Sequence, residues 1–122
     1  MAETGERLKR REAWRRGHVS EYAAALFLFF KGYRILAIRH RTKLGEIDII
    51  ARKGDLAVFV EVKARRGEQE AIDAVSFSAQ GRIRAASDLW LARQKDYGRL
   101  SQRYDIVVIL PGRWPRHFPD AF

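Results

Sequence analysis

Two carboxylates, those of Asp48 and Glu61, have the spacing that most directly indicates chemistry. The dipeptide Gly54–Asp55 favours a two-residue turn between two strands. In the register set by that turn, Asp48 lies opposite Glu61 and, nearer the strand ends, Glu46 lies opposite Lys63. Facing side chains have Cβ atoms about 4.5–5.5 Å apart, so two facing carboxylates repel each other. A divalent cation relieves that repulsion, and hard oxygen ligands favour Mg²⁺ or Mn²⁺.

Strand alternation sharpens this prediction, because side chains two residues apart share a face. One face of the hairpin is expected to be apolar near the turn and charged at its far end, formed by Glu46, Asp48, Ile50, Ala57, Phe59, Glu61 and Lys63. The alternative is a solvent-facing strand with a Glu46–Lys63 ion pair and two exposed acids. That alternative leaves the opposition of Asp48 and Glu61 unexplained, so we favour a metal site.

Glu21 is a third candidate acid. Its neighbours at helical spacing are the apolar residues Ala24, Ala25 and Leu28. A carboxylate in that setting is either a partly buried functional group or an acid stabilised by the dipole at the start of a helix. The sequence leaves both interpretations open.

The elements that must position these residues follow from hydrophobic periodicity. Ser20 is predicted to cap a helix that runs to about Lys31 and stops at Gly32. A second helix is expected within residues 71–93, best defined from about Gln80, with a bend at Gly81. Strands are expected at residues 34–40, 46–52, 56–64 and 104–110, with a short edge strand within 114–122. This αβββαβ order predicts an α/β fold with a central mixed sheet flanked by helices.

Composition sets the limits within which this site operates. The chain has 122 residues, which suits one domain over residues 17–122, with 1–16 as a flexible basic tail or frayed helix. Lys and Arg number 24 against 15 Asp and Glu, a net charge of +9 that favours a nucleic acid partner over a basic surface without one. The apolar run 23–30 is too short to cross a membrane, and the absence of cysteine fits a cytoplasmic protein.

The spacing of Asp48 and Glu61-Val62-Lys63 resembles the PD-(D/E)xK signature of restriction-endonuclease-like proteins. A longer set of residues is similar to the small bacterial YraN family, also labelled UPF0102. The similarity extends from about residue 17 to the end of the chain, and a set of this length is far more specific than Asp and Glu-x-Lys alone. The matching residues are Gly17, Glu21, Lys31-Gly32-Tyr33, Gly45-Glu46-Ile47-Asp48, Phe59-Val60-Glu61-Val62-Lys63, Arg65, Tyr104-Asp105, His117 and Ala121-Phe122.

The resemblance implies a metal-dependent endonuclease that hydrolyses phosphodiester bonds. Mg²⁺ or Mn²⁺ would be held by carboxylates and one backbone carbonyl, which are those of Asp48, Glu61, Glu21 and Val62. Lys63 would orient the attacking water and offset developing negative charge. Gln80 would position water or phosphate, or is simply a polar residue at the start of a helix.

Archaeal Holliday-junction resolvases look similar, which implies structured or branched DNA as the substrate and a homodimer as the active form. One departure is Ala79, where the family often has Lys, so that Arg82 or Arg84 would have to supply the missing charge. The expected phosphate contacts are all basic, namely Arg39, Arg41, Lys43, Arg65, Arg66, Arg82 and Arg84.

Other polar and aromatic residues have weaker assignments. His40 is expected in a phosphate-contact loop, while His18 and His117 are expected to be structural or exposed. The tryptophans Trp14 and Trp114 have the ring size to stack on unpaired bases, whereas Trp90 lies on an apolar helical stripe and is expected in the core. Two alternatives to a nuclease stay open: a non-catalytic nucleic-acid-binding module of the same fold, and a protein-interaction module that uses the sheet edge.

Overall fold

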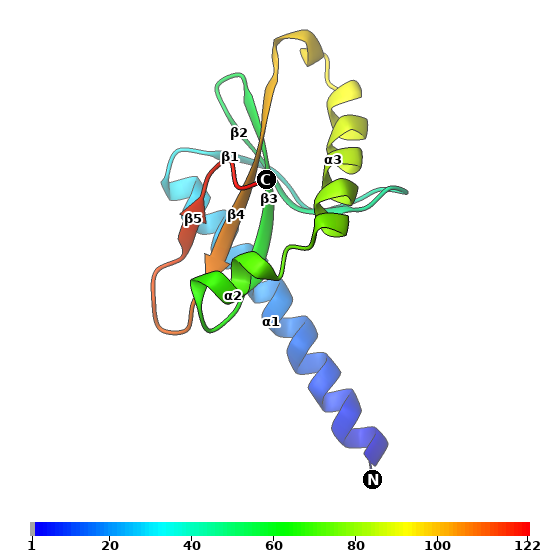
Figure 1. The fold of residues 1–122 in the computed structure, drawn as a ribbon, viewed down its shortest axis with the longest axis vertical. Helices are drawn as coiled ribbons and strands as arrows, with labels where there is room; N and C mark the ends of the chain where they lie inside the picture. The colour runs from blue at the N-terminus through cyan, green and yellow to red at the C-terminus, as the bar shows by residue number, and fades with distance from the viewer. Residues whose placement is uncertain (1) are drawn as a thin grey trace.

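The computed structural model describes the backbone of residues 2–122 and the side chains of residues 5–11 and 18–122. Its centre is a five-stranded mixed sheet in the order β1-β2-β3-β4-β5 (Figure 1). Strands β3 and β4 are parallel, and the other neighbouring pairs are antiparallel. The predicted α/β class with a mixed sheet is therefore confirmed. The strands are β1 (Arg34–Arg41), β2 (Glu46–Lys53), β3 (Leu56–Ala64), β4 (Ser101–Ile109) and β5 (Arg116–Phe118).

Helices cover both faces of the sheet. Helix α1 (Ala2–Phe30) packs Ala24 and Leu28 onto the face formed by the alternate β3 residues Val58, Val60 and Val62. The crossover that parallel pairing requires between β3 and β4 contains α2 (Glu68–Asp73), α3 (Phe77–Ala92) and a 3₁₀ turn (Tyr97–Arg99), and both α-helices lie on the other face. Within the part of the chain that the structure describes, no helix is long and apolar enough to span a membrane.

Helix α1 begins much earlier than the sequence predicted. The prediction that Ser20 caps this helix is wrong, because residue 20 lies well inside a continuous helix that starts at Ala2. Its N-terminal turns extend away from the sheet (Figure 1). The predicted end is confirmed: Gly32 has a left-handed φ of 96°, and the Tyr33 N–H donates to the carbonyl of Leu28. The mobility expected for residues 1–16 stays a prediction, and the side chain of Trp14 lies outside the described ones.

The predicted second helix is in fact two helices. Ser76 separates them, and its hydroxyl accepts a hydrogen bond from the Ala79 N–H at 3.1 Å, which starts α3 there. Gly81 lies inside α3, so the bend expected at that residue is absent. The edge strand expected within residues 114–122 is confirmed as β5, although β4 begins three residues earlier than predicted.

Candidate metal centre

The site lies where β2 and β3 separate. The predicted hairpin register is confirmed from Lys53↔Leu56 to Ile49↔Val60. The paired ladder ends there, one position before Asp48 and Glu61, so these two residues are not the direct cross-strand pair that was predicted. Instead the carboxylate of Asp48 lies between the strands, and its Oδ2 accepts a hydrogen bond from the Val62 N–H at 2.9 Å.

A local irregularity in β1 and β2 turns Asp48 toward α1. In a regular strand, residues two apart share a face, yet Ile49 packs in the core against α1 and Ile47 packs in the core against α3. Arg39 of β1, level with Asp48 in the ladder, has a left-handed φ of 54°. The prediction that Asp48 and Ile50 share a face is therefore wrong, since Ile50 contacts the α3 side while Asp48 approaches Glu21 of α1.

Three carboxylates meet at this point. Glu21, Glu46 and Asp48 each place one oxygen within 4.8 Å of the others. The Oε2 atom of Glu21 is the one buried side-chain nitrogen or oxygen without a hydrogen-bond partner among the residues described. Arg39 Nε lies 3.0 Å from it, close enough for an ion pair but not aligned for a hydrogen bond. Burial, and then the charges of Asp48 and Glu46, raise the pKa of Glu21 from 4.5 to about 7.

Glu61 and Lys63 adjoin this cluster. Lys63 Nζ lies 3.3 Å from Glu61 Oε1, and both side chains are largely buried. Burial and the neighbouring charge of Asp48 raise the pKa of Glu61 to about 7, despite the opposing effect of Lys63. Burial also raises the pKa of Asp48, against the Val62 N–H and Lys63, which lower it. The expected Glu46–Lys63 ion pair is not formed, because Glu46 instead contacts Arg41 at 3.4 Å.

These residues fit a hard divalent cation. Three carboxylates in one cluster, one of them with an unpartnered buried oxygen, form an oxygen-rich and electron-rich site that suits Mg²⁺ or Mn²⁺. The N–H of Val62 points into the fork between β2 and β3. In an extended strand the carbonyl of the same residue points to the same side, which makes the predicted Val62 ligand feasible. Glu61 contacts Asp48 but does not belong to the three-carboxylate cluster.

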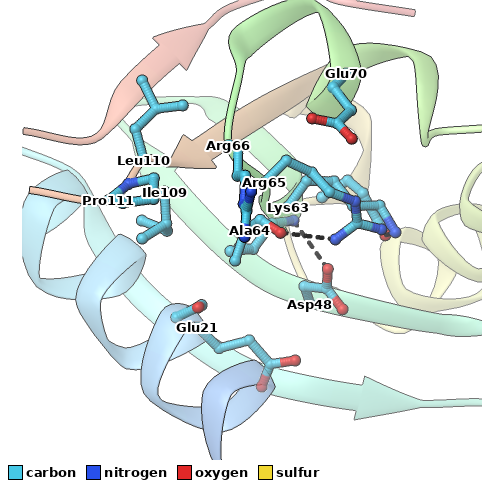
Figure 2. A pocket seen from close by; sticks show the side chains of 13 residues that line it. Glu21, Asp48, Lys63, Ala64, Arg65, Arg66, Glu70, Ile109, Leu110 and Pro111 are labelled. Carbon is cyan, nitrogen blue, oxygen red and sulfur yellow. Dashed lines mark hydrogen bonds and ion pairs between the residues drawn. The ribbon is translucent and has the colours of Figure 1, made fainter. Parts of the chain in front are cut away.

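The acids open into a pocket of about 760 Å³ between α1, the ends of β3 and β4, and α2. Figure 2 shows Glu21 and Asp48 on one side of this space and the residues that follow β3 on another. Lys63, Arg65 and Arg66 give the pocket its basic residues, while Ser20 and Glu70 also line it. A basic rim around an acidic floor binds an anion that also contacts a cation, as a phosphodiester bound next to a metal would.

The remaining predicted site residues lie elsewhere or have structural partners. Gln80 donates to the Val75 carbonyl at 3.3 Å and does not line the pocket, which supports its reading as a polar residue at a helix start. Arg82 donates to Ser78, and Arg84 stacks over the rings of Tyr104 and Phe122.

The basic and aromatic residues outside the pocket also differ in exposure. Lys43 is exposed in the β1–β2 turn, whereas His40 is half-buried in β1 rather than in a loop. Trp114 is exposed, as stacking on bases would require. Trp90 packs edge-on against Phe59, so its predicted place in the core is confirmed.

Gly45 lets the β1–β2 turn pack closely against α3. A Cβ atom at this position would lie 3.1 Å from both the Cβ atom and the backbone oxygen of Arg82 in α3. The turn is closed by Thr42, whose hydroxyl donates to the Gly45 carbonyl at 2.8 Å. The absence of a side chain at Gly45 permits this close approach of the turn to α3.

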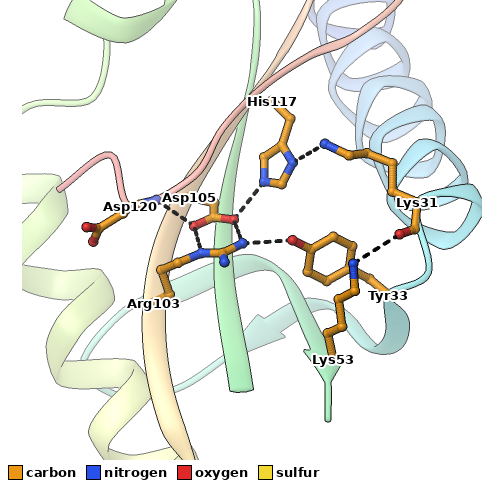
Figure 3. A network of polar contacts seen from close by, with 7 residues as sticks. All are labelled: Lys31, Tyr33, Lys53, Arg103, Asp105, His117 and Asp120. Carbon is orange, nitrogen blue, oxygen red and sulfur yellow. Dashed lines mark hydrogen bonds and ion pairs between the residues drawn. The ribbon is translucent and has the colours of Figure 1, made fainter. Parts of the chain in front are cut away.

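The polar residues near the C-terminus form a separate buried network (Figure 3). Asp105 is fully buried and accepts two hydrogen bonds from Arg103, one from the Asp120 N–H at 2.9 Å and one from His117 at 2.7 Å. The other ring nitrogen of His117 contacts Lys31 Nζ at 2.7 Å. These contacts join β4, β5 and the end of α1, so Asp105 and His117 are structural and lie outside the metal centre.

Sequence reasoning missed one member of the carboxylate cluster and two residues that line the pocket. Glu46 was assigned to Lys63 because regular alternation was assumed, and Ser20 was assigned to a helix cap. Glu70 lies on α2, a six-residue helix that the sequence did not separate from α3. The only signal for Glu46 was its place in the Gly45-Glu46-Ile47-Asp48 motif, which spacing alone did not turn into a ligand.

A mixed α/β domain with an acidic cluster at a fork in its sheet defines the class, and it is compatible with a restriction-endonuclease-like fold. The family model of the uncharacterised protein family UPF0102 matches residues 20–109. A UPF0102 protein of Rhizobium leguminosarum bv. trifolii is 75% identical over the full length of both chains. One of Agrobacterium fabrum is 63% identical over the full length of both, and one of Rhizobium meliloti is 66% identical over 91% of each. The chain belongs to the UPF0102 family.

Proposed function

We propose that this protein is a divalent-metal-dependent endonuclease that hydrolyses phosphodiester bonds in DNA. One observation carries the proposal: the Glu21, Glu46 and Asp48 carboxylates lie within 4.8 Å of one another, and Glu21 and Asp48 line a pocket that Lys63, Arg65 and Arg66 also line. Burial, and then the neighbouring carboxylates, raise the pKa values of Glu21 and Asp48, so ionising this cluster is costly unless a cation is bound. A functional cation site explains why the fold keeps buried carboxylates that are unfavourable to ionise.

The cation, when bound, would polarise the scissile phosphate and lower the pKa of a water molecule. The other groups come from the chain itself. Lys63 lies next to Glu61 and is the ammonium best placed to offset negative charge that develops on the phosphate. Arg65 and Arg66 line the pocket and are exposed, so they are available to bind the flanking phosphates.

Charge supports a nucleic acid as the substrate. A net charge of +9 on 122 residues creates a field that attracts a polyanion. Arg41 and Lys43 at the β1–β2 turn are exposed and lie close in sequence to Glu46, so phosphates reaching the acidic cluster would pass them. Branched or flapped DNA is the proposed substrate class, on the strength of the similarity to junction resolvases.

Single-turnover cleavage of linear, flapped and four-way DNA at fixed Mg²⁺ or Mn²⁺ tests the proposal. Asp48→Asn should abolish cleavage and weaken metal binding. Lys63→Ala should bind metal and DNA normally but cleave at least about a hundredfold more slowly, the scale expected for one charge-stabilising group. Lys53→Ala, whose lysine packs over Tyr33 away from the pocket, is the matched control.

Two results would contradict the assignment. If the wild type binds DNA but leaves every substrate intact with either metal, the protein is a binding module. If Lys63→Ala cleaves as fast as Lys53→Ala, the reaction takes place elsewhere on the molecule.

A further inference from the structure

Helix α1 carries an exposed apolar stripe beside its core-facing residues, and Tyr22 at the edge of this stripe is also contacted by Arg39 of β1. Five large side chains on this surface are each more than half exposed, although this part of the helix is the one packed onto the protein core. They are Val19, Tyr22, Leu26, Phe29 and Phe30. We call these five residues the α1 stripe.

The spacing of the stripe is that of a helix-pairing seam. Val19, Tyr22, Leu26 and Phe29 are separated by three, four and three residues, the alternating a and d positions of a heptad. Ala23 lies between the a and d positions and is small enough to let a second backbone approach. Such a seam is buried by another helix whose side chains repeat at the same spacing.

The exposed area is on the scale of an interface. The five side chains leave on the order of 600 Å² accessible, since large apolar residues each contribute roughly 150–250 Å² when fully exposed. Apolar patches above a few hundred Å² mark contact sites on soluble proteins. A stable complex buries about 800 Å² on each partner, so the stripe and its margin supply most of what a dimer requires.

We propose that the α1 stripe pairs with the α1 stripe of a second copy of this chain. Of the helices that the structure describes, α2 and α3 pack on the other face of the sheet, and Phe77 is their one large exposed apolar side chain, so neither offers a matching seam within the chain. The α1 helix of a second copy offers a seam with the same residues at the same spacing. This inference stands on the exposed seam alone and does not depend on the proposed nuclease activity.

Charge selects the orientation of the pair. The N-terminal part of α1 carries exposed Arg7, Lys9, Arg10 and Arg11, with Glu6 as the acid among them. A parallel pair would place these two basic segments side by side, whereas an antiparallel pair about the middle of the stripe separates them. The antiparallel arrangement therefore avoids the repulsion. It also places the Glu21 of each copy on the sheet side of its own helix, away from the contact.

Sedimentation equilibrium of the full chain, with and without stripe substitutions, tests the inference. The wild type should be a dimer at micromolar concentration. Leu26→Glu with Phe29→Glu should be a folded monomer with at least about a hundredfold weaker association, because two charges would be buried at the seam of each copy. Phe77→Glu is the matched control, since Phe77 is equally apolar and highly exposed but lies on α3. It should remain dimeric.

Cysteine cross-linking tests the orientation, because the chain contains no cysteine of its own. In an antiparallel pair, a short bismaleimide should link Leu26→Cys to its copy. Val19→Cys should not be linked, since the two positions would lie about 16 Å apart along the axis at 1.5 Å per residue. Efficient linking through residue 19 would indicate a parallel pair and overturn the charge argument.

Three outcomes overturn the pairing itself. A wild type that is monomeric at 100 times the expected dissociation constant has no such contact. A dimer that survives the double substitution uses another surface. A monomer that binds anionic lipid vesicles through residues 26 and 29 uses the stripe on a membrane instead.

Discussion

In the metal-free protein, the negative charge of the buried Glu21 carboxylate does not stabilise the fold. Burial and two neighbouring carboxylates raise its pKa from 4.5 to about 7, so the folded protein binds a proton that the unfolded chain releases. Stability of the metal-free protein must then fall as pH rises from about 4.5 to about 7. The same sign holds for Glu61, whose pKa is also raised to about 7.

Glu21→Gln should therefore stabilise the metal-free protein and remove its response to metal. At pH 8 in a chelator we expect a gain of about 1 kcal/mol, or roughly 4 °C in Tm for a domain of this size. Adding Mg²⁺ or Mn²⁺ should raise the Tm of the wild type and leave that of the variant unchanged. Thermal unfolding monitored by circular dichroism measures both effects.

The control for this prediction is Glu70→Gln, which removes an exposed pocket acid outside the three-carboxylate cluster. It should keep the metal response of the wild type. A Glu21→Gln protein that is destabilised in chelator, yet gains as much from metal as the wild type, would show that Glu21 is a structural acid.

At this scale the sequence identified most of the site but not its arrangement. The turn at Gly54–Asp55 predicts the hairpin register, and that register is present as far as Ile49↔Val60, one position before Asp48 and Glu61. The role of Glu46 depends on the left-handed φ of Arg39 and the switch of faces around Asp48. Both are features of the folded strands that a pattern of alternating residues does not contain.

Asp105 is a buried polar link between β4, strand β5 and the C-terminal segment. Burial alone would raise the pKa of this carboxyl, but hydrogen bonds from Arg103, His117 and the Asp120 N–H lower it to about 2. Its contribution to stability is therefore present above the ordinary value of 3.8 and is lost as pH falls toward 2. The element that depends on it is short, with three residues in β5.

Asp105→Asn should destabilise the protein by about 3 kcal/mol, because it removes one charge of a buried ion pair and leaves Arg103 uncompensated. Urea unfolding at pH 7 measures this loss. The variant should also show a smaller decrease in stability than the wild type between pH 4 and pH 2. Asp120→Asn is the control, since Asp120 contributes its backbone N–H and its left-handed φ of 53°, which Asn tolerates. Equal loss in both variants would contradict this account.

The bounds of a helix or strand were predictable where neighbouring residues in the sequence determine them. Strand β3 has the predicted bounds, Leu56–Ala64, because it follows a turn and is apolar except for Glu61 and Lys63. The division between α2 and α3 spans residues 74–76 and includes the hydroxyl of Ser76, which caps α3. The early start of α1 has no apolar periodicity to reveal it, and an i,i+4 pair such as Glu6–Arg10 adds little.

Over the whole molecule, only some of the basic side chains are free to contact a polyanion. Arg84 is stacked on Tyr104 and Phe122, and Arg103 is paired with buried Asp105. Arg65 lies at the pocket rim, exposed, with one guanidinium hydrogen bond to the backbone of Ala64. Net charge alone predicts attraction to a polyanion, but only the structure separates cations that are free to contact phosphate from those that stabilise the fold.

Arg65→Ala should therefore affect DNA binding, whereas Arg84→Ala should affect the stability of the fold. Each phosphate contact contributes about one unit to the slope of log affinity against log salt concentration, because each releases condensed counterions. Arg65→Ala should lower that slope by about one unit and leave the free energy of unfolding almost unchanged. Arg84→Ala should keep the slope and lose about 1 kcal/mol of stability with its ring contacts. Fluorescence anisotropy on a labelled duplex at four salt concentrations, with urea unfolding of both proteins, distinguishes the two effects. Equal slopes for Arg65→Ala and the wild type would place the bound DNA away from the acidic pocket.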